Sequence, residues 1–496
     1  MSDFRRRGGP KIEGGVDAVV LGASADALAA AALLARAGLH VVLIETGGGR
    51  FHDKAEFAPG YFAADGDPIA AALDQEVIDA LDLYRRGLSF ARRRLETFVR
   101  FSDGAALVLP GDPEIGHEAV AAMSEADADR YAGFIDAERK TARAMAAWFS
   151  GDATLDLSPD VYIEKSTASL DDMLAGRFED ARIFDYLRAE AALGAAARPS
   201  EPFTYLALLR RMAGDAAGLQ GGLAAIEGGG RGLVNALRRA GQAGGVAIRQ
   251  TDRVKSVIVE FDRVAGVEFD DGGQIRAPVI VSGLSARETF LDFIGRARLD
   301  IEFARTLDEP VARVAGARVN LAVNGPLADP NAAAALDRRF LYAPSPFELD
   351  RAFRLAGEGS CGAPLIAEMT FPSAFEAGLA PQGCAAASLH LHPVALRPLS
   401  DEPWRAEVEA AARVAFGRLA PGSASLITAL EVAAVDAAAP PTAAAIERRA
   451  RLTGASGLEG YFFCGPEAQI GGPLSLAAGR RASEGAMRYF RHGGID

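Results

Sequence analysis

The sequence has few cysteines and no long apolar run, and each shortage excludes a class of protein. Its three cysteines, Cys361, Cys384 and Cys464, are widely spaced and form no C-x-x-C pair, which excludes a disulfide framework and a cysteine-based zinc site. The longest apolar run near the start extends from Ala27 and stops at Arg36, far short of the ~20 residues that cross a bilayer. The charged start lacks the apolar stretch of a secretory signal, so we expect a cytoplasmic protein.

The sequence also has fewer basic than acidic residues. Lysine and arginine total 53 against 66 aspartates and glutamates, which gives a formal net charge of −13 at pH 7. A net-acidic surface repels phosphate backbones, so we expect no nucleic-acid partner. Apolar residues make up 49% and charged residues 24% of the 496 residues, as in globular proteins of about three domain-sized units.

The clearest local pattern is a strand, a turn, a helix and a second strand near the N-terminus. Residues 17–21 form a short apolar run, and a stretch of high helix propensity covers residues 27–37 before Gly38. A second apolar run covers residues 40–44 and ends at Glu45. This order predicts a βαβ unit with its crossover.

The remaining segments have simpler patterns. Apolar residues three and four apart predict helices over 69–83, 127–149 and 170–197. A glycine loop at 228–232 predicts the start of a helix over 233–240, and a last helix is expected from about 474 to 490. Short apolar runs predict strands over 246–248, 254–261, 264–269, 279–283 and 460–464. Residues 295–450 are interpreted only as a mixed region rich in alanine and proline.

The turn of the βαβ unit carries a candidate nucleotide-binding motif. Dinucleotide-binding folds use glycines there so that the backbone and a helix N-terminus can approach a pyrophosphate, and an acid after the second strand binds the ribose. The corresponding residues are Gly22, Ser24, Ala27 and Glu45, with small residues in place of the second and third glycines. Glu45 favours FAD or NAD over NADP. The alternative interpretation is an ordinary βαβ turn that binds no nucleotide.

Residues 16–45, VDAVVLGASADALAAAALLARAGLHVVLIE, resemble the N-terminus of the phytoene desaturase-like FAD-dependent oxidoreductases. The branch that they resemble most contains pyridine nucleotide-disulfide oxidoreductase domain-containing protein 2. The similarity continues at Gly48-Gly49, at EFAPGY from Glu56, at 228–233 and in the β segments up to 282, and it returns at 461–479. The resemblance implies an α/β fold, with a Rossmann-like FAD-binding domain (a parallel sheet plus a β-meander) and an inserted substrate domain.

The same resemblance assigns residues to the cofactor, but it identifies no catalytic residue and no metal ligand. The residues assigned to FAD binding are Gly22, Ser24, Ala27, Glu45, Gly48, Gly49, Val254, Gly465, Glu467, Gly471, Gly472 and Ala477. Glu467 stands where the family has glycine, and Gln469 stands where it has histidine. These departures keep two alternatives open: a cofactor-poor homologue that acts as a binding or scaffold subunit, and an NAD-binding dehydrogenase that uses only the first βαβ unit.

The resemblance also implies a domain division and a reaction. The FAD-binding domain would comprise residues 14–65, 225–292 and 455–496, and the substrate domain residues 66–224 and 293–454. The leading interpretation is an FAD-dependent dehydrogenase or desaturase that transfers a hydride from a hydrophobic, isoprenoid- or lipid-like substrate to flavin. An apolar substrate would suggest loose contact with a membrane surface, and a protein partner or a homo-oligomer is left open.

His390 and His392 form the one other pattern of interest. They are two residues apart, so on a strand both side chains point to the same face. A metal site would need further ligands that the sequence does not place, so we favour an ordinary strand face over a metal pair.

Overall fold

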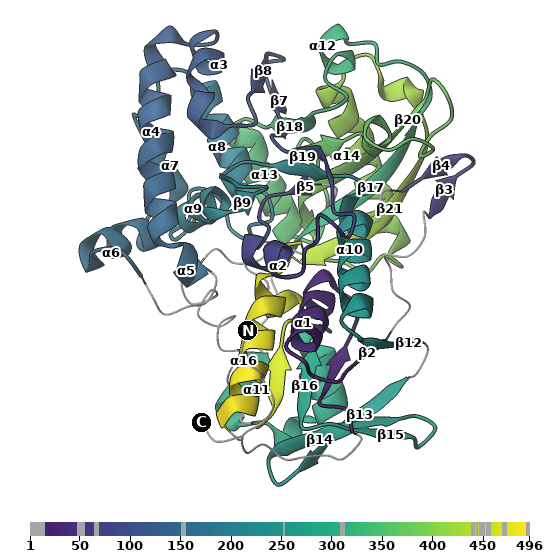
Figure 1. Ribbon diagram of the computed structural model, residues 1–496. Coiled ribbons are helices and arrows are strands. Elements are labelled where there is room, and N and C mark those ends of the chain that lie inside the picture. Colours follow the sequence, from purple (N-terminus) through teal and green to yellow (C-terminus); the bar gives the residue numbers. More distant parts are fainter. Residues whose placement is uncertain are drawn as a thin grey trace.

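The computed structural model shows the protein as two regions, each built around its own sheet (Figure 1). The structure describes residues 15–46, 55–63, 69–149, 155–250, 253–307, 313–437, 458–468 and 474–492, together with residues 442, 445 and 452.

The first region is built on a five-stranded sheet in which all neighbouring strands are parallel. Its strands, in spatial order, are β12 (Ala247–Gln250), β2 (Val41–Glu45), β1 (Ala18–Leu21), β16 (Val279–Ser282) and β22 (Tyr461–Phe463). Every residue of β1, β2 and β16 is buried, which is why these strands are continuous apolar runs rather than alternating ones. The sheet brings together strands from both ends of the chain.

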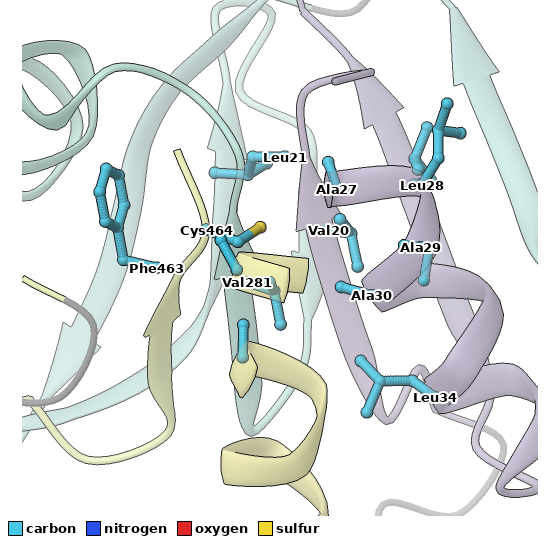
Figure 2. Packing of buried hydrophobic residues seen from close by; sticks show 14 of the residues in the cluster. Val20, Leu21, Ala27, Leu28, Ala29, Ala30, Leu34, Val281, Phe463 and Cys464 are labelled. Carbon is cyan, nitrogen blue, oxygen red and sulfur yellow. The ribbon is translucent and has the colours of Figure 1, made fainter. Parts of the chain in front are cut away.

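Three helices belong to this sheet: α1 (Ala25–Arg36), α10 (Gly229–Ala243) and α16 (Ala477–His492), and α1 packs against both of the others. The alanines of α1 allow this close packing, and Figure 2 shows Ala27 and Ala30 facing Val20 of β1. The two helices α1 and α16 approach closely at Gly479, where a Cβ atom would lie 2.2 Å from the carbonyl oxygen of Asp26. Only glycine fits at that position.

An antiparallel meander flanks the parallel sheet, as the sequence predicts. It consists of β13 (Val254–Glu260), β14 (Arg263–Phe269) and β15 (Gln274–Arg276), followed in the chain by β16 and a π-helical segment, η2 (Arg287–Ile294). The α/β fold class, with a Rossmann-like parallel sheet and a meander, is therefore confirmed.

The second region is a seven-stranded sheet. In spatial order its strands are β21 (Ile427–Ala437), β17 (Val314–Val323), β20 (Ala385–Ala395), β19 (Ile366–Thr370), β18 (Arg339–Ala343), β7 (Thr97–Phe101) and β8 (Ala106–Leu109). Successive residues of β7 face opposite ways, since Val99 and Phe101 join one apolar cluster and Phe98 joins another. The sheet therefore contributes to two separate cores.

Helices cover both faces of this sheet (Figure 1). The cluster that contains Phe98 also contains Trp404 and Val408 of α14 (Glu402–Leu419). The opposite cluster contains residues of α13 (Pro346–Gly357) and of a helical layer. The helices of that layer are α3 (His117–Ala121), α4 (Glu125–Ala144), α5 (Ala146–Phe149), α6 (Pro159–Thr167), α7 (Leu170–Leu174), α8 (Ala181–Ala192) and α9 (Tyr205–Ala213).

Two predicted helices are wrong in part. The predicted helix over 69–83 begins as a strand, β5 (Ile69–Ala70), because this segment pairs with the distant β11 (Ala224–Ile226), and only α2 (Gln75–Ala80) is helical. The predicted helix over 170–197 is divided into α7 and α8, with Gly176 at a φ of +68° between them. Both errors arise where a tertiary contact or a turn overrides a helical pattern.

A buried ion-pair network ties the seven-stranded sheet to the helical layer. Arg339 of β18 is 1% exposed and pairs with Glu190 of α8 and with Glu368 of β19. Burial acts to raise the pKa of Glu190, but the charges of Arg339 and Arg211 outweigh it and hold the pKa below its ordinary value. Glu190 is thus charged at neutral pH, and Arg339 is the cation that it shares with Glu368.

We expect Arg339→Met to lower the free energy of unfolding by about 3–5 kcal/mol, because it leaves two carboxylates buried without a full counter-charge. The matched control is Arg354→Met on α13, whose side chain is 55% exposed and pairs with Glu358 four residues on; we expect a change within about 0.5 kcal/mol. Urea denaturation followed by tryptophan fluorescence measures both. Equal effects of the two substitutions would contradict the role given to the network.

Candidate functional site

The candidate site lies where the strand order of the parallel sheet reverses. The chain passes from β1 through α1 to β2 on one side, whereas β16 lies on the other side of β1. In open α/β sheets, ligands bind outside the carboxyl ends of the strands at such a switch point. The loops that follow β1, β16 and β22 meet there, which makes this the place to test the predicted nucleotide-binding residues.

The turn after β1 has the backbone geometry that the motif requires. Gly22 has a φ of +93°, and a Cβ atom there would lie 3.0 Å from the side chain of Leu284, in the loop after β16. Ser24 is the N-cap of α1, and its hydroxyl accepts a 3.2 Å hydrogen bond from the main-chain N–H of Ala27. The serine therefore already uses one of the N–H groups that this helix N-terminus could offer to a phosphate.

Glu45 lies at the end of β2, where an acid that binds ribose is expected, but it has partners within the protein. It is 5% exposed and forms an ion pair with Arg238 of α10. Its other carboxylate oxygen accepts a 3.2 Å hydrogen bond from the side chain of Gln250, at the end of β12. The negative charge of Glu45, which would meet the ribose hydroxyls, is thus compensated by Arg238.

A second acid, Asp26, connects the two ends of the chain. It is completely buried in the first turn of α1, and its Oδ1 accepts a 2.8 Å hydrogen bond from the main-chain N–H of Gly479, in the first turn of α16. A negative charge is favourable at a helix N-terminus, so the carboxylate caps α16. Sequence reasoning missed this contact, although an acid inside the glycine motif was the signal that could have indicated it.

The loop after β22 packs on the loop after β16. A Cβ atom on Gly465 would lie 2.0 Å from the carbonyl oxygen of Leu284, so this position accepts only glycine. The side chain of Glu467 accepts a 3.0 Å hydrogen bond from the main-chain N–H of Ala286, just before η2. Glu467 therefore stabilises the start of η2, which gives this acid a structural role of its own.

The other predicted residues are divided between described and undescribed segments. Val254 is buried at the start of β13, opposite Phe269 of β14. Ala477 is half-buried as the first residue of α16. Gly48, Gly49, Gly471 and Gly472 lie outside the described residues.

These observations test whether the described residues fit FAD. The main chain fits, since Gly22, the N-terminus of α1 and an acid after β2 lie at the switch point in the order that a dinucleotide needs. The side chains of Ser24 and Glu45 would have to exchange their present partners on binding. We therefore expect the chain to bind FAD more weakly than a site with free groups would.

The histidine pair is not part of this site. His392 is fully buried on β20, and its Nε2 lies 2.9 Å from the carbonyl oxygen of Ala195. Burial lowers the pKa of His392 to about 3, so the ring is neutral at physiological pH. Among the described residues no group of three or more histidine, cysteine or acidic side chains could hold a metal ion. The described helices likewise include none long and apolar enough to cross a membrane.

No protein-family model matches the chain. The chain is similar to the curated mouse (Mus musculus) protein named pyridine nucleotide-disulfide oxidoreductase domain-containing protein 2. The two are 24% identical over an alignment of 555 positions, gaps included, which covers 96% of this chain and 94% of that protein. This finding confirms the resemblance predicted from residues 16–45.

Solved structures agree on the fold. An oxidoreductase from Methanosarcina mazei superposes with a TM-score of 0.65 at 17% identity, covering 95% of this chain and all of that one. Putrescine oxidase bound to putrescine superposes with a TM-score of 0.61 at 15% identity, covering 96% of this chain and 98% of that one. At these identities the likeness shows the fold alone.

The thiols give a direct test of packing at the site. Cys464 follows β22 and is fully buried, beside Leu21 and Val281 in Figure 2, and burial raises the pKa of its thiol well above the ordinary value. Burial also raises the pKa of Cys361 to about 12. Cys384 is only half-buried. We expect an aromatic disulfide reagent at pH 8 to label Cys384 rapidly and the other two thiols only after unfolding.

Cys384→Ser is the control for this experiment and should abolish the rapid phase. Mass spectrometry of the labelled peptides identifies each thiol. Rapid labelling of Cys464 in the native protein would contradict the close packing of the loops at the switch point.

Proposed function

We propose that this chain is an FAD-dependent oxidoreductase. The observation that carries the proposal is the switch point of the parallel sheet, where the N-terminus of α1, the turn at Gly22 and the acid Glu45 come together. The similarity to named oxidoreductases over almost the whole chain supports it. Flavin supplies the redox chemistry in such enzymes by accepting a hydride, and the protein binds and orients both partners.

The residues of this chain would divide the binding of FAD among three parts of the site. The turn at Gly22 and the first N–H groups of α1 would hold the pyrophosphate, because a helix N-terminus attracts anions. Glu45 would bind the ribose hydroxyls after releasing Arg238. The main chain at Val254, where β13 begins beside the sheet, would meet the adenine.

We also propose a hydrophobic substrate. The support is the resemblance of the chain to phytoene desaturase-like enzymes. Such a substrate would be held by the loss of water-exposed apolar surface rather than by charge.

A second function has one observation in its favour. Ser24, Asp26, Glu45 and Glu467 all have hydrogen-bonding or ionic partners inside the protein. A descendant of the same fold that no longer binds FAD, and acts as a binding or scaffold subunit, would have the same engaged groups.

Purified protein distinguishes the two functions. We expect a yellow preparation, or a colourless one that takes up added FAD, with an absorption that bleaches under dithionite. Ser24→Gly should tighten FAD binding several-fold, since it frees the N–H of Ala27 for the pyrophosphate while costing α1 only a few tenths of a kcal/mol. Fluorescence titration with FAD measures the dissociation constants.

The matched control is Ser158→Gly, which removes the corresponding N-cap serine from α6 in the helical layer. We expect it to leave the FAD dissociation constant unchanged. A protein that takes up no FAD, as wild type or as Ser24→Gly, would refute the oxidoreductase proposal and favour the scaffold. Saturable binding of NADH without any effect of FAD would favour a dehydrogenase that uses only the first βαβ unit.

A further inference from the structure

A pocket lies in the second region, and it does not involve the dinucleotide site. Its empty volume is about 660 Å³ with the open solvent at its mouth included, and within it a space of about 60 Å³ is available to the centre of a water-sized molecule. It lies between α4, α8 and α9 of the helical layer, the segment after β8 and the loop 221–223. None of the residues predicted to bind FAD lines it.

Most of the pocket wall is apolar. This part is formed by Ile135 of α4, Leu208 and Met212 of α9, Leu109 at the end of β8 and Leu223 of the loop 221–223. Tyr131 and Ile135 lie four residues apart on α4, and Arg139 follows after four more, so all three side chains point from one face of the helix into the pocket. The row ends in a cation, which gives the pocket one charged end and one apolar end.

Two arginines and one glutamate line the charged end. Each oxygen of Glu190 already has an arginine partner, Oε1 with Arg339 and Oε2 with Arg211. Arg211 also donates a 3.1 Å hydrogen bond to the carbonyl oxygen of Gly221, which fixes its guanidinium at the wall. The charges of the lining residues are thus Arg139 and Arg211 against Glu190, an excess of one positive charge.

Arg139 supplies the observation that points to a ligand. Its side chain is only 7% exposed, and its Nε is buried without a hydrogen-bond partner. The Nε packs against Gly221 in the pocket wall, since a Cβ atom on that glycine would lie in ordinary contact with it, 3.7 Å away. Its one carboxylate partner, Glu114, contacts Nη1, is 67% exposed and does not line the pocket. A buried guanidinium N–H without an acceptor is costly, and a bound anion would relieve that cost.

We propose that this pocket binds an apolar carboxylic acid, whose carboxylate is held by Arg139 and Arg211 and whose hydrocarbon part packs on the leucine-rich wall. Guanidinium groups match a carboxylate because their N–H donors lie in one plane. Burial raises the pKa of the Tyr131 hydroxyl, which therefore stays protonated and can donate a further hydrogen bond. The proposal requires no flavin and does not rest on the proposed redox function.

Isothermal titration calorimetry of the full chain with octanoate tests the proposal. We expect saturable binding of octanoate and no binding of octylamine or 1-octanol over the same concentration range, because both lack the carboxylate. Arg139→Gln should weaken octanoate binding about tenfold or more, as expected for the loss of a charged hydrogen bond. The matched control is Lys140→Gln, which removes a cation from the next position of α4, 72% exposed and outside the pocket, and should leave the affinity unchanged.

Thermal unfolding establishes first that each variant is folded. If Arg139→Gln does not fold, Arg139→Lys replaces it, since lysine retains the charge that faces Glu114 but removes the Nε–H; octanoate binding should again weaken. Equal binding of 1-octanol, or an octanoate affinity unchanged in the folded Arg139 variant, would overturn the proposal. Inorganic phosphate that binds with the same dependence on Arg139, while octanoate does not bind, would overturn it too, because the apolar wall would then have no part.

Discussion

One hydrogen bond joins residues 453 positions apart, and the parallel-sheet region depends on it. The carboxylate of Asp26 at the start of α1 accepts the main-chain N–H of Gly479 at the start of α16. Because both groups are buried, neither can turn to water, so the two helix N-termini must stay together. The absence of a side chain at Gly479 makes the approach possible. The last segment of the chain is thereby placed over the sheet that the first segment begins.

This constraint explains why polar side chains of the candidate site already have partners within the protein. Where α1 and α16 begin close together, the loops after β1, β16 and β22 must pack on one another, as the contacts of Gly22 and Gly465 with Leu284 demonstrate. Polar groups in such a place need partners, and those of Ser24 and Glu45 find them inside the protein. A dinucleotide would compete with contacts that already stabilise the fold. The affinity for FAD is therefore set by a difference in free energy between the hydrogen bonds that FAD would form and the internal hydrogen bonds that it would displace.

In the second region, two buried arginines differ in how fully they are paired. Arg339 joins β18 to α8 and β19 through two carboxylates, so its charge is fully compensated. Arg139 on α4 is nearly as buried but keeps an N–H without an acceptor, beside a pocket with apolar walls. A cation of this kind contributes to the fold, whereas one that keeps an unpaired N–H beside a pocket is suited to a ligand. FAD binding in the first region and carboxylate binding in the second can thus be tested separately.

The sequence by itself determined the βαβ unit, the meander and the final strand and helix, because each depends on a local run of apolar residues and on the turn that ends it. It also indicated Gly22 and Glu45, since their spacing is set by the length of one βαβ unit. Only the tertiary structure decided the partner of Glu45, because Arg238 lies on a helix almost two hundred residues later. The seven-stranded sheet and the Arg139 pocket were decided in the same way: their strands and walls come from distant segments, and contacts at such separations leave no pattern in a local window.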